Sequence, residues 1–281
     1  MRTAVLSEAA DDFMAHGYEL IGEPLNLHRT GRSWFKHAFE GQTSVPNGCA
    51  LVLGATPWLV DYFLEHGRSV LVADKSTVML DGLRTRLSPR SLAKSYHSLN
   101  YNWTRLPNTI ADLAVTVGDN SFSFLPFPTA WVDLCTFLSA RMLPQAVLAI
   151  RICSPPRQHR RRTAAALIAD FVKTGRFNWT ELRAAILFSC WNANDGTIRT
   201  EEALATFNSD RVAFETLLRQ HSAVDNDLVT IEKYRGVNAI YYAPTLDRAL
   251  EIVSDRFFIR SVHYGPYAMS EYFPLILASR R

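Results

Sequence analysis

Residues 49–80 read CALVLGATPWLVDYFLEHGRSVLVADKSTVML, and this stretch decides the fold. The short apolar run CALVLG is typical of a buried strand and ends on Gly54. WLVDYFLEHG then places its apolar residues at helical spacing and ends on Gly67, which suits a helix C-cap. SVLVAD indicates a second buried strand, closed by Asp74. The stretch therefore predicts a strand, a helix and a second strand.

The same alternation continues toward residue 155. A weak strand is expected near SYHSLNYN and a strong one at ADLAVTVGD. PTAWVDLCTFLSARMLP then indicates a helix, and QAVLAIRIC a further strand. Strands that alternate with helices imply right-handed crossovers and a mostly parallel sheet. We therefore predict an α/β fold built on a Rossmann-like, doubly wound sheet.

Composition along the chain divides it into four segments. Residues 1–48 are expected to form a helical lid over one edge of the sheet, and residues 49–155 to form the Rossmann-like core. Residues 156–229 show helical patterning with few strand signals, which predicts a helical insertion. Residues 230–281 return to strand-like patterning, with FFIRSVHYG and EYFPLILASRR separated by a turn-prone segment. They predict a C-terminal β-hairpin that completes the core sheet.

Charge and cysteine usage narrow the class of partner. The 281 residues carry 30 Lys and Arg against 27 Asp and Glu, and a net charge of +3 creates no global field that attracts nucleic acid. The basic run at 157–162 has no neighbouring aromatic residues for base stacking, so a solvated loop or helix start is expected there. The four cysteines lack the spacing of a zinc site, and no metal is expected.

The placement of acidic and apolar residues along the sequence predicts where in the cell the protein is found. The first residues, MRTAVLSEAADDFMAHG, carry acids where a secretory signal needs an apolar stretch, and no later run reaches membrane-spanning length. We therefore expect a cytoplasmic monomer or homodimer. Its partner is expected to be a small molecule rather than nucleic acid or membrane.

The first two strand ends predict a nucleoside ligand. In open α/β sheets the ligand lies beyond the carboxyl ends of the strands. There Gly54 permits close backbone approach, and Pro57 suits the first position of a helix. Asp74 follows that glycine by about 20 residues, the offset at which a carboxylate accepts both ribose hydroxyls.

Two further strand ends extend the predicted site. Asn102 offers an amide to an adenine edge, and Trp103 an aromatic face beside the ring. The polar turn at 118–120 would lie between the ribose and the amino-acid end of the ligand. Four strand ends are thus expected to converge on one ligand.

These motifs resemble those of a known family. Through VLGATPWLVDYFLEHGRSVLVADKSTVMLDGL, YNWTRLP and LAVTVGDNSFSFLPFP, residues 49 to about 152 resemble the class I S-adenosylmethionine-dependent methyltransferases, and most closely the branch whose first motif reads L-G-x-T-P. The resemblance implies S-adenosyl-L-methionine as cofactor and methyl transfer to an O or N atom of a small-molecule acceptor. Two features depart from the family pattern: the first motif has a single glycine, and Asn102 stands where an acid is common.

The resemblance also implies roles for individual residues. Gly54 would approach the methionine portion, Asp74 would bind the ribose hydroxyls, and Asn102 with Trp103 would contact adenine. The turn at 118–120 would face the sulfonium. The cofactor-binding residues implied in this way are Gly54, Ala55, Thr56, Pro57, Asp74, Lys75, Met79, Asn102, Trp103, Gly118, Asp119 and Asn120.

Other functions stay open at this stage. A dinucleotide enzyme needs G-x-G-x-x-G to hold a pyrophosphate, yet Gly54 is followed by ATPWL, so an NAD-dependent oxidoreductase is disfavoured. A non-catalytic protein that binds S-adenosylmethionine is the main alternative, because the sequence singles out no general base. An apolar acceptor pocket would be lined by aromatic residues, and we place Trp34, His37 and Trp191 in it.

Overall fold

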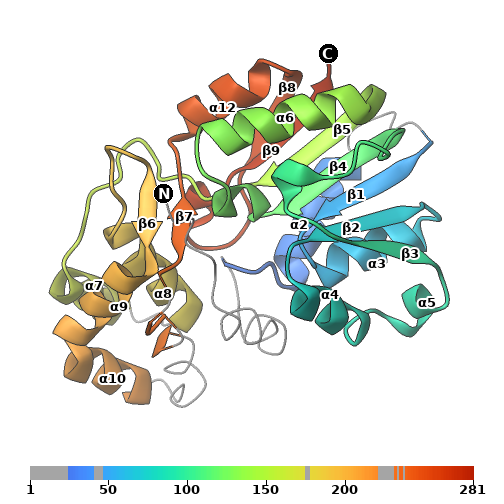
Figure 1. Ribbon diagram of the computed structural model, residues 1–281. Helices are drawn as coiled ribbons and strands as arrows, with labels where there is room; N and C mark the ends of the chain where they lie inside the picture. Colours follow the sequence, from blue (N-terminus) through green and yellow to red (C-terminus); the bar gives the residue numbers. More distant parts are fainter. Residues whose placement is uncertain (1–24, 41–46, 175–177, 221–230, 233, 237) are drawn as a thin grey trace.

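A seven-stranded sheet forms the centre of the computed structural model, which describes residues 25–40, 47–174, 178–220, 231–232, 234–236 and 238–281 (Figure 1). In spatial order the strands are β3 (Tyr96–Asn100), β2 (Val70–Asp74), β1 (Cys49–Leu53), β4 (Leu113–Asp119), β5 (Met142–Arg151), β9 (Leu275–Arg280) and β8 (Phe257–His263). Strand order reverses between β1 and β4, where the chain crosses from one half of the sheet to the other. This is the position at which open α/β sheets bind ligands.

The strand directions confirm the predicted fold class. β3, β2, β1, β4 and β5 are parallel, whereas β9 runs antiparallel to both β5 and β8. β8 and β9 form the predicted C-terminal hairpin, and the one-turn helix η4 (Ser270–Tyr272) lies in its connection. The parallel register places Leu53 beside both Ala73 and Gly118, so the ends of three strands meet at one edge.

Side-chain alternation along the strands builds a core on each face of the sheet. Ala50 and Val52 pack on the face covered by α2 (Arg29–Glu40), α3 (Pro57–Glu65) and α4 (Thr77–Arg84). Leu51 and Leu53 pack on the opposite face, with α6 (Thr129–Arg141) and α12 (Leu246–Ser254). Because both faces are covered, the central strands are apolar throughout, which is the pattern that identified them.

Short local signals set where the helices begin. α3 begins at Pro57, as expected, since proline lacks only an amide proton that the first helical turn cannot use. α4 begins after Ser76, whose hydroxyl accepts a hydrogen bond from the Met79 amide at 3.3 Å. The four-residue helix α5 (Pro89–Leu92) follows, and the one-turn helices η2 (Trp103–Arg105) and η3 (Ser121–Phe124) follow β3 and β4.

The chain between β5 and α12 forms a separate lobe beside the sheet (Figure 1). Its helices are α7 (Ala164–Thr174), α8 (Trp179–Ser189), α9 (Thr200–Ser209) and α10 (Arg211–Gln220). Two three-residue strands, β6 (Thr197–Arg199) and β7 (Ile240–Tyr242), pair antiparallel. The sequence indicated the helices but not β6 and β7, because three residues are too few to show alternation. The lobe has its own hydrophobic core.

The N-terminal segment is described only in part. Residues 1–24 and 41–46 of the predicted lid lie outside the described residues, and α2 is the helix that the structure describes in this segment. α2 packs through Phe35 and Phe39 on the core that also contains α3.

The described helices are short. A bilayer crossing needs about 20 apolar residues, and α6 has 13. Across the described ranges, no helix has the length and apolar character to cross a membrane.

The basic run at 157–162 lies at the surface. Arg157 pairs with Asp247, Arg161 with Glu202 and Arg162 with Asp170, and all six side chains are more than a third exposed. Each of these three arginines thus has a carboxylate beside it. Apart from the half-buried His159, the run is solvated, as the sequence indicated.

Gly118 provides a test of how tightly the end of β4 is packed. A Cβ at this position would collide with Oγ of Ser121, which is 2% exposed and has no hydrogen-bond partner among the described residues. We expect Gly118→Ala to lower the free energy of unfolding by about 1–3 kcal/mol, as overpacking does, in urea denaturation. The double variant Gly118→Ala/Ser121→Ala should recover most of this loss, because it removes the colliding atom. Equal losses in both variants would contradict this account.

Candidate functional site

Gly54, Asp74 and Trp103 meet at the carboxyl ends of β1 and β2. Gly54 has a φ of +93°, a conformation that favours glycine. A Cβ atom on Gly54 would lie 3.7 Å from Cζ2 of Trp103 and 4.0 Å from Oδ2 of Asp74. Three residues that the sequence assigned to one ligand, from three different strand ends, therefore lie side by side.

The carboxylate of Asp74 is held in one orientation by backbone amides. Oδ2 accepts a hydrogen bond from the Ala55 amide at 3.1 Å, and Oδ1 accepts one from the Ser76 amide at 3.0 Å. Asp74 is 9% exposed. A carboxylate has about four acceptor sites, so these two bonds are compatible with hydroxyl groups of a ligand as further donors. The amides fix the side chain beside the end of β1 before any ligand arrives.

Trp103 is fixed across the same edge. Its Nε1 donates a hydrogen bond to the Ala73 carbonyl at 2.6 Å. Oδ1 of Asn102 holds the turn that carries this tryptophan by accepting bonds from N and Oγ1 of Thr104, both at 3.1 Å. The indole therefore lies against Gly54 and the end of β2, and the Asn102 carbonyl oxygen serves the turn.

The remaining predicted residues of the first two motifs surround this cluster. Thr56 is buried at the N-cap of α3, between Ala55 and Pro57. Lys75 is exposed immediately after Asp74, and Met79 is half-buried on α4. The predicted residues thus lie along one edge, around the backbone turn at Gly54.

The end of β4 carries a buried ion pair. Nε of Arg151 lies 2.5 Å from Oδ1 of Asp119, and the two side chains are 0% and 5% exposed. Arg151 also donates to the hydroxyl of Tyr267 at 3.4 Å and to the Leu25 carbonyl at 3.2 Å. Burial by itself would lower the pKa of Arg151, but the Asp119 carboxylate and Tyr267 raise it above its ordinary value. Asp119 therefore neutralises a permanent charge inside the protein.

Asn120 links the start of the described chain to this edge. Its φ of +59° places it in the left-handed region, and its amide nitrogen Nδ2 donates to the Leu25 carbonyl at 3.2 Å. Asn26 and Leu27, which follow, are 4% and 0% exposed. The segment that precedes α2 therefore crosses the carboxyl ends of β4 and β5.

The three predicted acceptor residues lie in two places. Trp34 and His37 are on α2, and the Trp34 ring packs edge-on against Tyr267 with ring centres 6.0 Å apart. Trp191 is in the lobe, where its Nε1 donates to the Ala243 carbonyl at 2.9 Å. Trp34 thus approaches the strand ends through Tyr267, the partner of Arg151, whereas Trp191 belongs to the lobe.

Sequence reasoning missed a cavity of about 330 Å³ between the lobe and the C-terminal hairpin connection. Phe188 of α8, His159 and Tyr272 are among its lining residues, and Nδ1 of His159 lies 3.1 Å from the Tyr272 hydroxyl. Burial, and secondarily the charge of Arg161, lower the pKa of His159, so this imidazole is neutral at pH 7. Its lining combines residues of 159–189 with residues of 269–272, about 80 positions further along the chain, and no local pattern indicated it.

Comparison with known proteins identifies relatives by structure alone. No family model matches this chain, and no curated protein matches its sequence. Among solved structures, a putative zinc-dependent alcohol dehydrogenase from Rhodobacter sphaeroides is similar with a TM-score of 0.57 at 17% identity, covering 96% of this chain and 98% of its own. Among the described residues, no group of three or more His, Cys, Asp or Glu side chains gathers as metal ligands would.

Several of the similar structures are named as methyltransferases. An S-adenosylmethionine-dependent methyltransferase from Methanosarcina mazei has a TM-score of 0.54 at 12% identity, covering 91% of this chain and 98% of its own. A glycopeptide N-methyltransferase in complex with S-adenosylhomocysteine has a TM-score of 0.51 at 13% identity, and the match covers 99% of this chain and 100% of that protein. At these identities the likeness concerns the fold. The chain has an α/β fold of the class I methyltransferase type, with a seven-stranded mixed sheet.

The ion pair at the end of β4 generates a stability prediction. Replacing one partner leaves the other charge buried and unpaired, which costs about 3–5 kcal/mol. We expect Asp119→Asn and Arg151→Met each to show a loss of this order in urea denaturation. Arg157→Met is the matched control, because the Arg157–Asp247 pair is exposed and should change stability little. Similar midpoints for all three variants would show that the buried pair does not hold this edge together.

Proposed function

We propose that this protein binds S-adenosyl-L-methionine and transfers its methyl group to a small-molecule acceptor at oxygen or nitrogen. The observation that carries the proposal is the contact between Gly54, Asp74 and Trp103 beyond β1 and β2. These residues belong to the motifs that resemble class I methyltransferases, and Gly54 follows β1, one of the two strands between which the strand order reverses.

The chemistry of this edge suits a nucleoside. Asp74 presents a fixed carboxylate, which accepts hydrogen bonds and pairs well with vicinal ribose hydroxyls. The backbone after Gly54 is accessible to close approach because glycine carries no side chain. The Trp103 ring packs against that glycine, so it would form the wall of the pocket or turn about its side-chain bonds as the ligand enters. The remaining predicted contacts, from Ala55 to Pro57 and at Lys75 and Met79, would flank the ligand.

The residues of the chain would act mainly by positioning. When bound, the cofactor would supply an electrophilic methyl group: an acceptor lone pair would form a bond to the methyl carbon in line with the C–S bond, which breaks and leaves its electron pair on sulfur as a neutral thioether. The backbone beyond β4, at 118–120, would lie beside the sulfonium, and the lobe would bring the acceptor to it and exclude water. An amine acceptor needs only to be unprotonated, whereas a hydroxyl acceptor needs a base within hydrogen-bond reach.

A non-catalytic protein that binds the same cofactor is the second candidate. The observation that favours it is the closure of the β4 end, where Asp119 is committed to Arg151 and Asn120 to the Leu25 carbonyl. Such a protein would bind the cofactor and show no turnover. An NAD-dependent oxidoreductase is less favoured, because the turn after β1 has the single glycine Gly54.

The first experiment is calorimetric titration of the purified protein with S-adenosylhomocysteine, in parallel with NAD. We expect micromolar binding of S-adenosylhomocysteine and none of NAD. Asp74→Ala should weaken that binding at least tenfold, since hydrogen bonds to a charged group are worth about 1.5–3 kcal/mol each and about 1.4 kcal/mol corresponds to tenfold.

Asp81→Ala is the matched control, because Asp81 is an exposed acid on the helix that follows Asp74. Its affinity for S-adenosylhomocysteine should equal that of the wild type, and far-ultraviolet circular dichroism should show both variants folded. Tighter binding of NAD, or undiminished binding by a folded Asp74→Ala variant, would overturn the proposal. Turnover of labelled S-adenosylmethionine with an acceptor library then separates the enzyme from the non-catalytic candidate.

A further inference from the structure

Arg183 is a buried cation without a counter-ion in the described part of the chain. It lies on α8 and is 5% exposed. Its Nε donates a hydrogen bond to the Tyr234 hydroxyl at 3.1 Å, and its guanidinium lies 5.4 Å from the centre of the same ring. No carboxylate of a described residue lies within ion-pair distance of it. One phenol is therefore its principal polar partner.

Such an arrangement is unusual, because buried charges in proteins are normally paired. The protein itself supplies the comparison. Arg151, the other arginine buried among the described residues, lies against the Asp119 carboxylate and also donates to a backbone carbonyl. Arg183 has the burial of Arg151 without the carboxylate. A negatively charged ligand would complete its environment.

The groups around Arg183 are donors rather than anions. The Tyr234 hydroxyl, which accepts from Arg183, keeps its own proton to donate, and Tyr234 is within hydrogen-bond reach of Tyr241 on β7. Burial, followed by the neighbouring Tyr234, raises the pKa of Tyr241, although Arg183 opposes the shift. The Tyr241 phenol therefore stays protonated at neutral pH. The bond between the two hydroxyls uses one of their protons, so the guanidinium and one hydroxyl donor are left for an anion.

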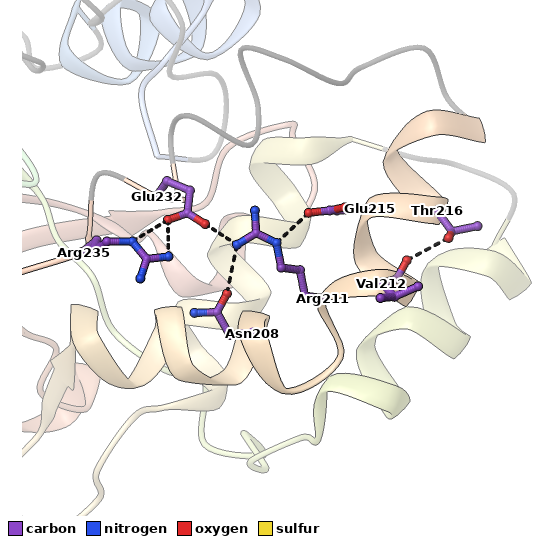
Figure 2. A network of polar contacts seen from close by, with 7 residues as sticks. All are labelled: Asn208, Arg211, Val212, Glu215, Thr216, Glu232 and Arg235. Atoms are coloured by element: carbon purple, nitrogen blue, oxygen red, sulfur yellow. Dashed lines mark hydrogen bonds and ion pairs between the residues drawn. The ribbon is translucent and has the colours of Figure 1, made fainter.

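The segment that carries Tyr234 is held in place by surface ion pairs (Figure 2). Glu232 accepts from Arg211 at 2.6 Å and from Arg235 at 2.6 Å. Arg211 also reaches Glu215 on α10 at 2.6 Å. The network joins the start of α10 to Glu232 and Arg235, which stand on either side of Tyr234 in the sequence.

This cluster connects to the end of β4, where the methyl group is expected. The Tyr241 ring packs against Phe124 of η3 with ring centres 5.2 Å apart. The Cys153 thiol is close enough to act on the pKa of Tyr241, and it lies 3.8 Å from Oδ1 of Asn120. Through Phe124, which follows β4, the cluster around Arg183 thus lies close to the turn that carries Asn120.

We propose that Arg183, Tyr234 and Tyr241 bind the carboxylate of a small aromatic acid. A planar carboxylate matches one guanidinium in charge and geometry, whereas a phosphate dianion calls for more cationic groups. The rings of Phe124 and Tyr241 provide the apolar surface for the rest of the molecule. This anion site stands on its own geometry, but the role of its ligand as methyl acceptor, with the nucleophile toward Asn120, rests on the proposed function.

Benzoate is the probe for this site. The full chain is titrated with benzoate by calorimetry at constant ionic strength, without cofactor. We expect saturable binding to the wild type and to Arg157→Met, and at least tenfold weaker binding to Arg183→Met. Arg157→Met is the matched control, because Arg157 is an exposed arginine that already has the carboxylate of Asp247.

Two further measurements test the proposal if the Arg183→Met variant is unstable. Tyr241→Phe removes one hydroxyl and should weaken benzoate binding by a smaller factor. The urea midpoint of Arg183→Met should equal or exceed that of the wild type, since an unpaired buried charge is removed, whereas Arg151→Met should lower it. Loss of stability in Arg183→Met with unchanged benzoate binding in Tyr241→Phe would assign the cluster to structure alone and overturn the proposal.

Other outcomes of the titrations also decide whether this cluster binds a carboxylate. Equal benzoate affinity in the wild type and a folded Arg183→Met variant, no binding to the wild type, or tighter binding of inorganic phosphate would each overturn the carboxylate site. The S-adenosylhomocysteine titration is separate from these. Benzoate binding without S-adenosylhomocysteine binding would leave the anion site in place and remove its role in methyl transfer.

Discussion

The buried pair of Arg151 and Asp119 is the interaction on which the rest of the carboxyl edge depends. It joins the ends of β4 and β5, and Arg151 extends it to Tyr267 near the C-terminus and to the Leu25 carbonyl near the N-terminus. Four segments distant in the sequence are therefore fixed by one guanidinium. Because burial makes each contact strong and each loss costly, this edge behaves as one unit.

The carboxyl edge of the sheet has two halves, which differ in the chemical groups that they offer to a ligand. On the β1 and β2 side, Asp74 is oriented by backbone amides and Trp103 rests on Gly54, which leaves a polar and aromatic surface suited to a nucleoside. On the β4 and β5 side, Asp119 is neutralised and the chain crosses overhead at Leu25. The lobe meets this second half through Tyr241 and Phe124. A ligand held by Arg183 would therefore approach the first half from the lobe.

Local sequence patterns predicted the fold well, because an apolar run and a residue that begins a helix can each be recognised within a few consecutive positions. Apolar runs gave the buried strands, and Pro57 marked the start of a helix. The same patterns could not predict β6 and β7, which have three residues each, or the cavity beside His159, whose lining residues lie far apart in the sequence. The sequence also assigned Asp119 to the cofactor from its place after a strand. Its pairing with Arg151 lies 32 residues away in the chain, where no spacing rule applies.

By itself, the sequence determined the order of strands and helices, the doubly wound class and the grouping of Gly54, Asp74 and Trp103 at strand ends, because hydrophobic period and chain direction fix these. Tertiary structure alone decided which charges are neutralised. Arg151 and Arg183 look alike in the sequence, but one is buried against a carboxylate and the other against phenols. That difference depends on which side chains folding places within a few ångströms of each other, since electrostatic interactions strengthen steeply once water is excluded.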